Sequence, residues 1–259
     1  MGGTQSFTAL VPQLHCPPAI SGRFCRRRDV TLRLHPRMWT PTQPNEIRDM
    51  HSNLIMFCVV PRSSRHLHTA AIQFQLVDPY KMPIATLERT HDTSYDAVVY
   101  PVTAVDASAD EFGHHETRHV GVITPHTSQC VQWTDPVTQE SFVCTYEGDW
   151  GSHNGCFWLQ RGFESPRERV ARVYRPDATS GHAFNQDYHL DVAAGVDIAL
   201  LLLICAAFDD TTHTRREEDE RAAAEIASHR HWRGVDRDML TPFSPRQSQA
   251  ERCQVPVPA

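Results

Sequence analysis

The residue types best suited to chemistry in this sequence form one short motif, His115-Glu116-Thr117-Arg118-His119. Two histidines at this spacing lie one turn apart on a helix, where both can bind one Zn²⁺ while the glutamate activates a bound water. That arrangement is the signature of zinc metallopeptidases.

The flanking residues favour a polar loop over such a site. Gly113 and Gly121 bracket the motif, and Val120–Ile123 has the apolar pattern of a strand, so nothing fixes a buried helix here. We therefore expect no catalytic residue, no metal site and no cofactor, and we expect that the chain is not an enzyme. Two alternatives stay open: a zinc peptidase acting through the two histidines and the glutamate, and incidental metal binding by the same loop.

The first residues, MGGTQS, match the pattern for N-myristoylation, in which Met1 is removed and Gly2 is acylated. One acyl chain gives only marginal membrane binding, so a second signal is required. Palmitoylation of Cys16 or Cys25 could supply that signal. The other interpretation is an unstructured start that matches a loose pattern by chance.

Two groups of arginines are candidates for binding lipid headgroups. Arg26, Arg27 and Arg28 are consecutive, while Arg169 and Arg172 lie in a basic segment that has the pattern of a strand. Each basic side chain close to an anionic membrane surface contributes about 1 kcal/mol to binding. The alternative for the second group is a solvated outer face of a β-sheet.

The elements that would carry these residues are mainly β-strands. Ala71–Val77 alternates apolar and polar residues, and the alternation resumes after a turn that contains Asp and Pro, which predicts a hairpin. Gln129–Tyr146 predicts a second hairpin. Further strands are predicted for Leu54–Val60, Gly155–Gln160, Arg169–Tyr174 and Asp187–Val192. Many short strands separated by turns are typical of a sandwich or a barrel.

The most apolar run, Ile198–Phe208, predicts a helix buried in the protein core. Spanning a bilayer takes roughly 20 apolar residues in a helix, and this run is shorter and bounded by aspartates. A helix that is apolar on every side must still be surrounded by apolar groups. We expect Asp197 to accept the free N–H groups at the helix start. The side chains expected to fill the inside of the β structure are Leu201, Leu202, Ile204 and Phe208.

The stretch DYHLDVAAGVDIALLLLICAAFDD, residues 187–210, resembles the closing strand and central helix of LURP-one-related proteins. FQLVDPYKMPIATLER resembles the early hairpin of that family, and CTYEGDWGSHNGCFWLQRG followed by RVARVYR resembles its late strands. These proteins share a superfamily with the tubby C-terminal domain and the phospholipid scramblases. The resemblance implies a mainly β, tubby-like closed antiparallel barrel of about twelve strands around a central hydrophobic C-terminal helix.

Two features depart from that family pattern. Pro79-Tyr80-Lys81 stands where a glycine is expected in the first turn, and Ala107–Val122 resembles an inserted loop. The sequence also shows no counterpart of the calcium-binding segment of the scramblases.

Composition and patterning predict three parts in a chain of 259 residues. We expect a flexible N-terminal arm at residues 1–22, the barrel at residues 23–210, and a tail at residues 211–259 that is first a charged helix and then disordered. The net charge of −6 argues against a nucleic-acid partner. The eight cysteines form no CxxC pair and no signal peptide is visible, which favours an intracellular, cytoplasmic protein.

These features together predict a non-enzymatic, tubby-like binding module. Its expected partners are acidic phospholipids, at which it would associate peripherally with membranes, without a transmembrane span. The alternative is a protein-interaction scaffold without lipid activity, whose charged tail helix contacts a protein partner.

Overall fold

The computed structural model describes residues 9–13, 16–61, 74–91, 94–99, 118–125, 127, 129–135, 137–162, 164–176 and 187–238. The chain divides into two compact units, Met1–Thr214 and Arg215–Ala259. All the described strands belong to the first unit.

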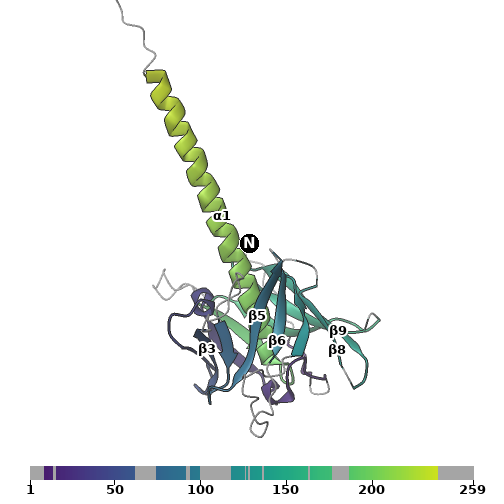
Figure 1. Cartoon of the computed structure of the whole chain (residues 1–259). Coiled ribbons are helices and arrows are strands. Elements are labelled where there is room, and N and C mark those ends of the chain that lie inside the picture. The colour runs from purple at the N-terminus through teal and green to yellow at the C-terminus, as the bar shows by residue number, and fades with distance from the viewer. Residues whose placement is uncertain are drawn as a thin grey trace, which may run out of the picture. The chain divides into compact units, whose positions relative to one another are not determined.

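The described part of the first unit contains two antiparallel sheets of six strands each (Figure 1). Along the first sheet the order is β1 (Val30–Leu34), β12 (Tyr188–Val192), β11 (Glu168–Tyr174), β10 (Asn154–Arg161), β9 (Ser141–Asp149) and β8 (Val131–Thr134). Along the second sheet the order is β2 (Asn45–Arg48), β3 (Ile55–Pro61), β4 (Phe74–Val77), β5 (Pro83–His91), β6 (Ser94–Val99) and β7 (Arg118–Ile123). Two short 3₁₀ helices, η1 (Gly22–Phe24) and η2 (Pro36–Trp39), flank β1. The protein is therefore mainly β, as the sequence predicts.

Both predicted hairpins are confirmed. Strands β4 and β5 pair with Leu76 opposite Ala85, and strands β8 and β9 pair with Trp133 opposite Phe142. The four single strands predicted along the rest of the chain correspond to β3, β10, β11 and β12. Alternation of apolar and polar residues was a reliable signal here because each sheet buries one face against the core.

Three hairpin turns begin with an aspartate whose carboxylate closes the turn. Asp49, Asp78 and Asp135 follow β2, β4 and β8, and each accepts hydrogen bonds from backbone N–H groups of the following residues. Each turn also contains one left-handed residue that is not glycine, namely Asn53 (φ 55°), Lys81 (φ 65°) or Gln139 (φ 59°). Side-chain hydrogen bonds of this kind fix a turn without glycine, which accounts for the missing glycine after β4.

Isolated contacts join the edges of the two sheets. On one side, the N–H of Met50, just after β2, donates to the carbonyl oxygen of Thr31 in β1 at 2.8 Å. On the other side, β7 comes so close to β8 that a Cβ atom on Gly121 would lie 2.6 Å from the carbonyl oxygen of Gln132. Within the described residues, continuous strand pairing exists inside each sheet and not between the sheets.

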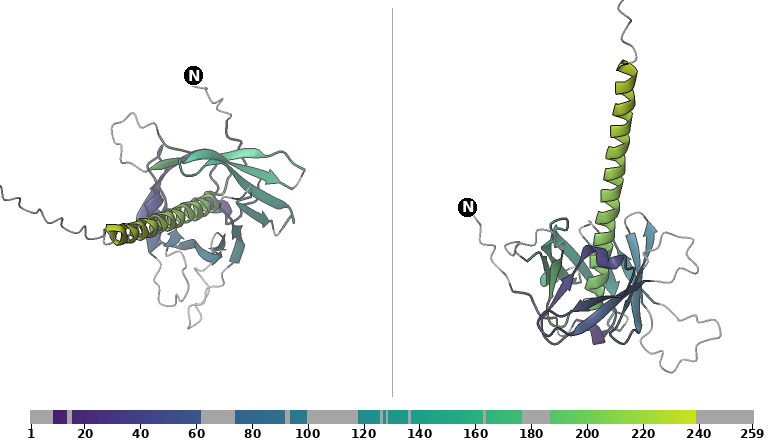
Figure 2. Two further views of the ribbon diagram at one scale, coloured as in Figure 1. Left: turned by 90° about the horizontal axis from the view of Figure 1, so that it is seen from above. Right: turned by 90° about the vertical axis from the view of Figure 1, so that its left-hand side faces the viewer.

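The core of the first unit is the beginning of helix α1 (Ile198–Asp238). Every side chain of Ile198–Phe208 is buried, and strands lie on more than one side of this segment (Figure 2). The predicted core helix is confirmed, including the burial of Leu201, Leu202, Ile204 and Phe208. Among the helices of the described residues, none combines the length and apolar content needed to cross a membrane.

The sequence predicts two helices in this region, a core helix and a charged tail helix, and this prediction was wrong. The structure has one helix, because the chain from Ile198 to Arg233 contains neither proline nor glycine to interrupt it. The residues from Arg215 to Ile226 are exposed, in agreement with their charged composition.

We expect Leu202→Ala to lower the free energy of unfolding by about 2–5 kcal/mol, because the side chain is completely buried and its loss leaves a cavity. Urea denaturation measures the change. Ile226→Ala is the control on the same helix, since Ile226 is 55% exposed and its truncation should change stability by less than about 0.5 kcal/mol. Equal effects of the two substitutions would contradict the buried position of the helix.

Candidate functional site

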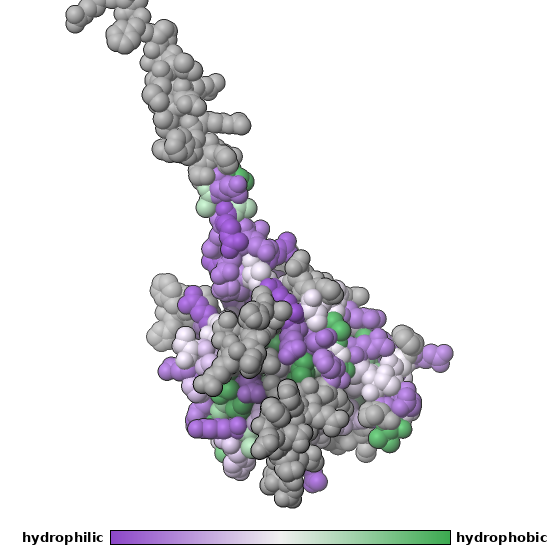
Figure 3. Space-filling model, viewed as in Figure 1, coloured by the Kyte–Doolittle hydropathy of each residue, from purple (hydrophilic) through white to green (hydrophobic). Residues whose placement is uncertain are grey.

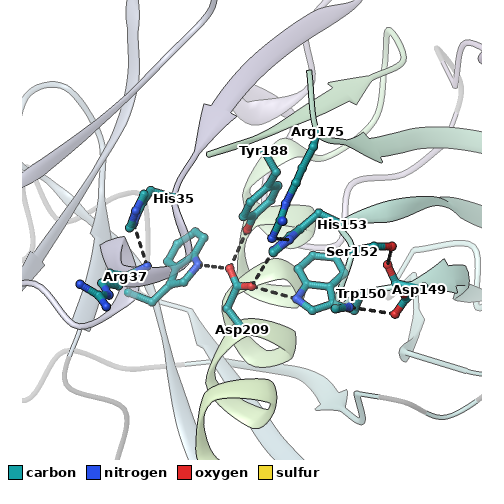
Figure 4. A network of polar contacts seen from close by, with 11 residues as sticks. His35, Arg37, Asp149, Trp150, Ser152, His153, Arg175, Tyr188 and Asp209 are labelled. Carbon is teal, nitrogen blue, oxygen red and sulfur yellow. Dashed lines mark hydrogen bonds and ion pairs between the residues drawn. The ribbon is translucent and has the colours of Figure 1, made fainter. Parts of the chain in front are cut away.

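The carboxylate of Asp209, at the end of the buried part of α1, is the centre of a polar network (Figure 4). Oδ2 accepts hydrogen bonds from Trp39 Nε1 at 2.8 Å and from the Tyr188 hydroxyl at 2.7 Å. Oδ1 accepts one from Trp150 Nε1 at 2.8 Å and is 3.3 Å from His153 Nε2. Four elements therefore converge on one side chain: η2, the β9–β10 turn, β12 and α1.

The protonation of His153 follows from its two neighbours. Nη2 of Arg175 lies 3.0 Å from Nδ1 of His153. A guanidinium can only donate, so Nδ1 accepts and the ring proton sits on Nε2, which donates to Asp209. The ring of His153 thus links Arg175 to Asp209.

This network contains the side-chain types of an acid–base catalytic site, but a substrate would not reach them. Asp209, His153, Trp150 and Tyr188 are all buried. Both carboxylate oxygens are already occupied by donors. The arrangement fixes the end of the buried helix segment, and we assign it a structural role.

Asp197 plays the corresponding role at the start of α1. Oδ1 accepts from the N–H groups of Ala199 and Leu200, at 3.1 and 3.3 Å, which confirms the predicted cap. Oδ2 accepts from the N–H groups of Ile20 and Ser21, at 2.7 and 3.1 Å. Burial raises the pKa of Asp197 to about 6, although these four hydrogen bonds oppose the rise.

The same carboxylate fastens the segment that the sequence predicts as an N-terminal arm. Two other described residues of this segment form backbone hydrogen bonds with residues close to the end of the strand order: the Val11 N–H donates to the carbonyl oxygen of Arg169 in β11, and the Gln13 N–H donates to that of Ala194, just after β12. The described part of the arm therefore lies along the sheet.

A cavity of about 500 Å³ lies between the segment before β1 and the turns after β2 and β4. The charged residues in its lining are Arg23, Arg26, Arg28, Asp49 and Asp78, and the apolar ones are Phe24, Val30, Leu54, Ile55, Met56, Phe57 and Pro79. Its arginine segment is held in place because Cys25 forms a β-bridge with Asp197 and the N–H of Gly195 donates to the carbonyl of Arg26 at 2.7 Å.

The arginines of the cavity differ in their partners. Arg23 and Arg28 each lie 3.7 Å from a carboxylate, that of Asp78 and that of Asp49 respectively. Burial alone would raise the pKa of Asp49, but hydrogen bonds from the Ser52 hydroxyl and from backbone N–H groups outweigh burial and lower it. Asp49 is therefore ionised at neutral pH.

Arg26 has no carboxylate partner in the part of the chain that the structure describes. Its polar contact is with the sulfur of Met56, at 3.7 Å from Nη2, and a thioether is only a weak acceptor. The cavity lining contains three arginines and two aspartates, which gives it a net charge of one positive unit. A group with several strong acceptor oxygens would complete this site.

The structure separates the two groups of arginines that the sequence predicts as lipid-binding. All three residues of the basic run are exposed, but only Arg26 and Arg28 line the cavity, and Arg27 does not belong to the lining. Arg169 and Arg172 lie on β11, outside the cavity, where Arg169 contacts Cys156 Sγ and the guanidinium of Arg172 lies over the Tyr174 ring. Sequence reasoning missed Arg23, whose only signal was its place three residues before the basic run.

The remaining predicted sites lie mostly outside the described residues. This applies to Gly2 and to His115 and Glu116 of the zinc motif. His119 lies on strand β7, near Asp96, and the described residues contain no group of three or more His, Cys, Asp or Glu side chains that could hold a metal ion. Burial raises the pKa of the Cys16 thiol to about 11 and also raises that of Cys25, so both are protonated at neutral pH.

No model of a known protein family matches the sequence, and no curated protein matches it. An X-ray structure of a protein from Arabidopsis thaliana is similar over 75% of this chain and 98% of that chain, at 12% sequence identity and with a TM-score of 0.45. These values assign neither a family nor an activity.

Asp209→Asn should lower the free energy of unfolding by about 3 kcal/mol, because the amide –NH₂ would face buried donors that then lack an acceptor. Asp210→Asn is the control at the next position, since Asp210 is only partly buried and Asn can still accept from the Tyr95 hydroxyl. Thermal or urea unfolding measures both variants. If Asp209→Asn lowers the free energy of unfolding no more than Asp210→Asn does, the network does not have the structural role assigned to it.

Asp197 should make stability depend on pH in a defined direction. Its folded-state pKa of about 6 is above the ordinary 3.8, so its contribution to stability is fully present below pH 4 and is lost as the pH rises through 6. Asp197→Asn does not titrate. The unfolding free energy of the wild type minus that of the variant should fall by up to roughly 3 kcal/mol between pH 4 and pH 7. If the difference in unfolding free energy between wild type and variant instead grows with pH, the four hydrogen bonds lower the pKa of Asp197 by more than burial raises it.

Proposed function

We propose that this chain is a non-enzymatic binding module that associates peripherally with membranes by holding the phosphate of acidic phospholipids in its arginine-lined cavity. The observation that carries the proposal is Arg26, a guanidinium that faces a cavity and has no acidic partner among the described residues.

A phosphate group suits the charges of this lining. Guanidinium groups bind phosphate oxygens through paired, charge-assisted hydrogen bonds, which are stronger than those between neutral groups. Arg23 and Arg28 lie at 3.7 Å from their carboxylates, which is longer than a direct hydrogen bond, so both retain donors for a ligand.

The apolar part of the lining favours an amphiphile over a free anion. Phe24, Leu54, Met56 and Phe57 border the same cavity as the arginines. A phospholipid offers both a phosphate and apolar glycerol and acyl groups, whereas inorganic phosphate would leave these side chains without a partner.

We further propose that the chain is a LURP-one-related protein and that its two sheets close into one tubby-like barrel of about twelve strands. The resemblance of residues 187–210 to that family supports the first statement, and the close approach of β7 to β8 supports the second. An intracellular location at the cytoplasmic face of membranes agrees with this function.

Flotation with vesicles of phosphatidylserine and phosphatidylcholine tests the proposal. The triple variant Arg23→Ala, Arg26→Ala, Arg28→Ala should bind roughly a hundredfold more weakly than the wild type, since each arginine contributes about 1 kcal/mol. The matched control removes the same charge from exposed positions on α1: Arg215→Ala, Arg216→Ala, Arg221→Ala.

Two results would count against lipid binding. If the wild type does not float, the protein-interaction scaffold becomes the better hypothesis. If both triple variants lose the same affinity, the vesicles respond to overall charge and the cavity has no particular role.

A further inference from the structure

We propose that the protein docks on the bilayer through two hairpin turns at the mouth of the cavity, whose exposed apolar side chains insert among the lipid headgroups. This inference rests on the proposed function and names the surface that performs it. The two turns are the one after β2, residues 49–54, and the one after β4, residues 78–82.

Exposed apolar side chains are concentrated on these turns. In the part of the chain that the structure describes, eight large apolar side chains are exposed, and four of them belong to the two turns. Met50 and Leu54 lie on the first turn, with 46% and 61% exposed, and Tyr80 and Met82 on the second, with 87% and 41% exposed. Such a concentration marks an interaction surface, whereas single exposed apolar residues need no explanation.

The other exposed apolar residues of the described chain lie apart from one another in sequence. On the face in Figure 3, the hydrophobic patches are small and separated by hydrophilic residues. The other four exposed apolar residues are Val11 in the N-terminal segment, Val122 on β7, Val137 in the turn between β8 and β9, and Ile226 on α1.

The turns are linked directly to the arginines of the cavity. Asp49 closes the first turn and lies 3.7 Å from Arg28, and Asp78 closes the second and lies 3.7 Å from Arg23. Leu54 and Tyr80 also line the cavity itself. A lipid phosphate in the cavity would therefore bring both turns to the level of the headgroups.

The fixed shape of the turns lowers the cost of insertion. Backbone N–H groups of both turns are already bound to the two aspartates, so little conformational freedom is lost when the turns enter the interface.

Charge complementarity selects a membrane as the occupant of this surface. A tyrosine and long aliphatic side chains surround a cavity with a net positive lining, and aromatic side chains prefer the depth of the headgroups while arginines attract anionic lipid. Either contribution alone is weak, and stable peripheral binding requires two.

The test is the double variant Met50→Ser, Met82→Ser, which changes one exposed side chain on each turn, and neither of these side chains lines the cavity. It is compared with Val122→Thr, at an exposed apolar residue in the middle of β7. Flotation uses vesicles of phosphatidylserine and phosphatidylcholine at low and at physiological salt. Calorimetry with soluble glycerophosphoserine measures headgroup binding without a bilayer. We expect the double variant to bind vesicles about tenfold more weakly, most clearly at physiological salt, and to bind glycerophosphoserine like the wild type. Val122→Thr should match the wild type in both assays.

The outcomes separate this inference from the proposed function. Wild-type vesicle binding by the double variant, together with its loss in the arginine triple variant, would overturn insertion and leave headgroup binding intact. Loss in the double variant with full binding in the triple variant would overturn headgroup binding by the cavity. Equal losses for the double variant and Val122→Thr would show that the turns are not special, which also overturns the inference.

Discussion

The burial of a helix segment that is apolar on every side is the constraint on which this structure depends. Ile198–Phe208 has no polar face, so it is stable only where apolar side chains surround it completely. A single sheet covers one side of a helix, and the strands of two sheets supply the rest. The inward-facing residues of both sheets, such as Leu32, Phe57 and Leu190, are buried accordingly.

A buried helix also has polar backbone groups at its start, which water cannot reach. Asp197 satisfies two of them and uses its second oxygen for the N-terminal segment, so one carboxylate serves two parts of the chain. Asp209 marks the other boundary of the apolar segment and gathers donors from three further elements. The chemistry at the two boundaries differs in consequence. The Asp209 network is closed, while the start of α1 adjoins the cavity through the arginine segment.

Much of the fold could be predicted from the sequence, because alternation along strands and a wholly apolar run are local signals. The hairpins, the single strands and the core helix were found in this way. The single helix was not, because the consecutive aspartates Asp209 and Asp210 resemble the end of a helix. In the structure, donors from η2, the β9–β10 turn and β12 hold the Asp209 carboxylate in the interior. The cavity was found in part. Arg26 and Arg28 stand in a visible basic run. The pairing of Arg28 with Asp49 and of Arg23 with Asp78 depends on how separate turns meet, and no spacing in the sequence encodes that.

The position of the core helix in chain order has a consequence for how the protein is made. The helix follows every described strand. The strand just before it, β12, pairs with β1, so that Thr31 and Asp191, 160 residues apart in sequence, lie opposite each other. A ribosome must therefore release almost the whole first unit before the interior can be filled. Until then the inner faces of the sheets have no partner, and contacts between residues so distant in sequence form slowly. Until the apolar segment of α1 has been added, the nascent chain exposes apolar surface of the kind that promotes aggregation.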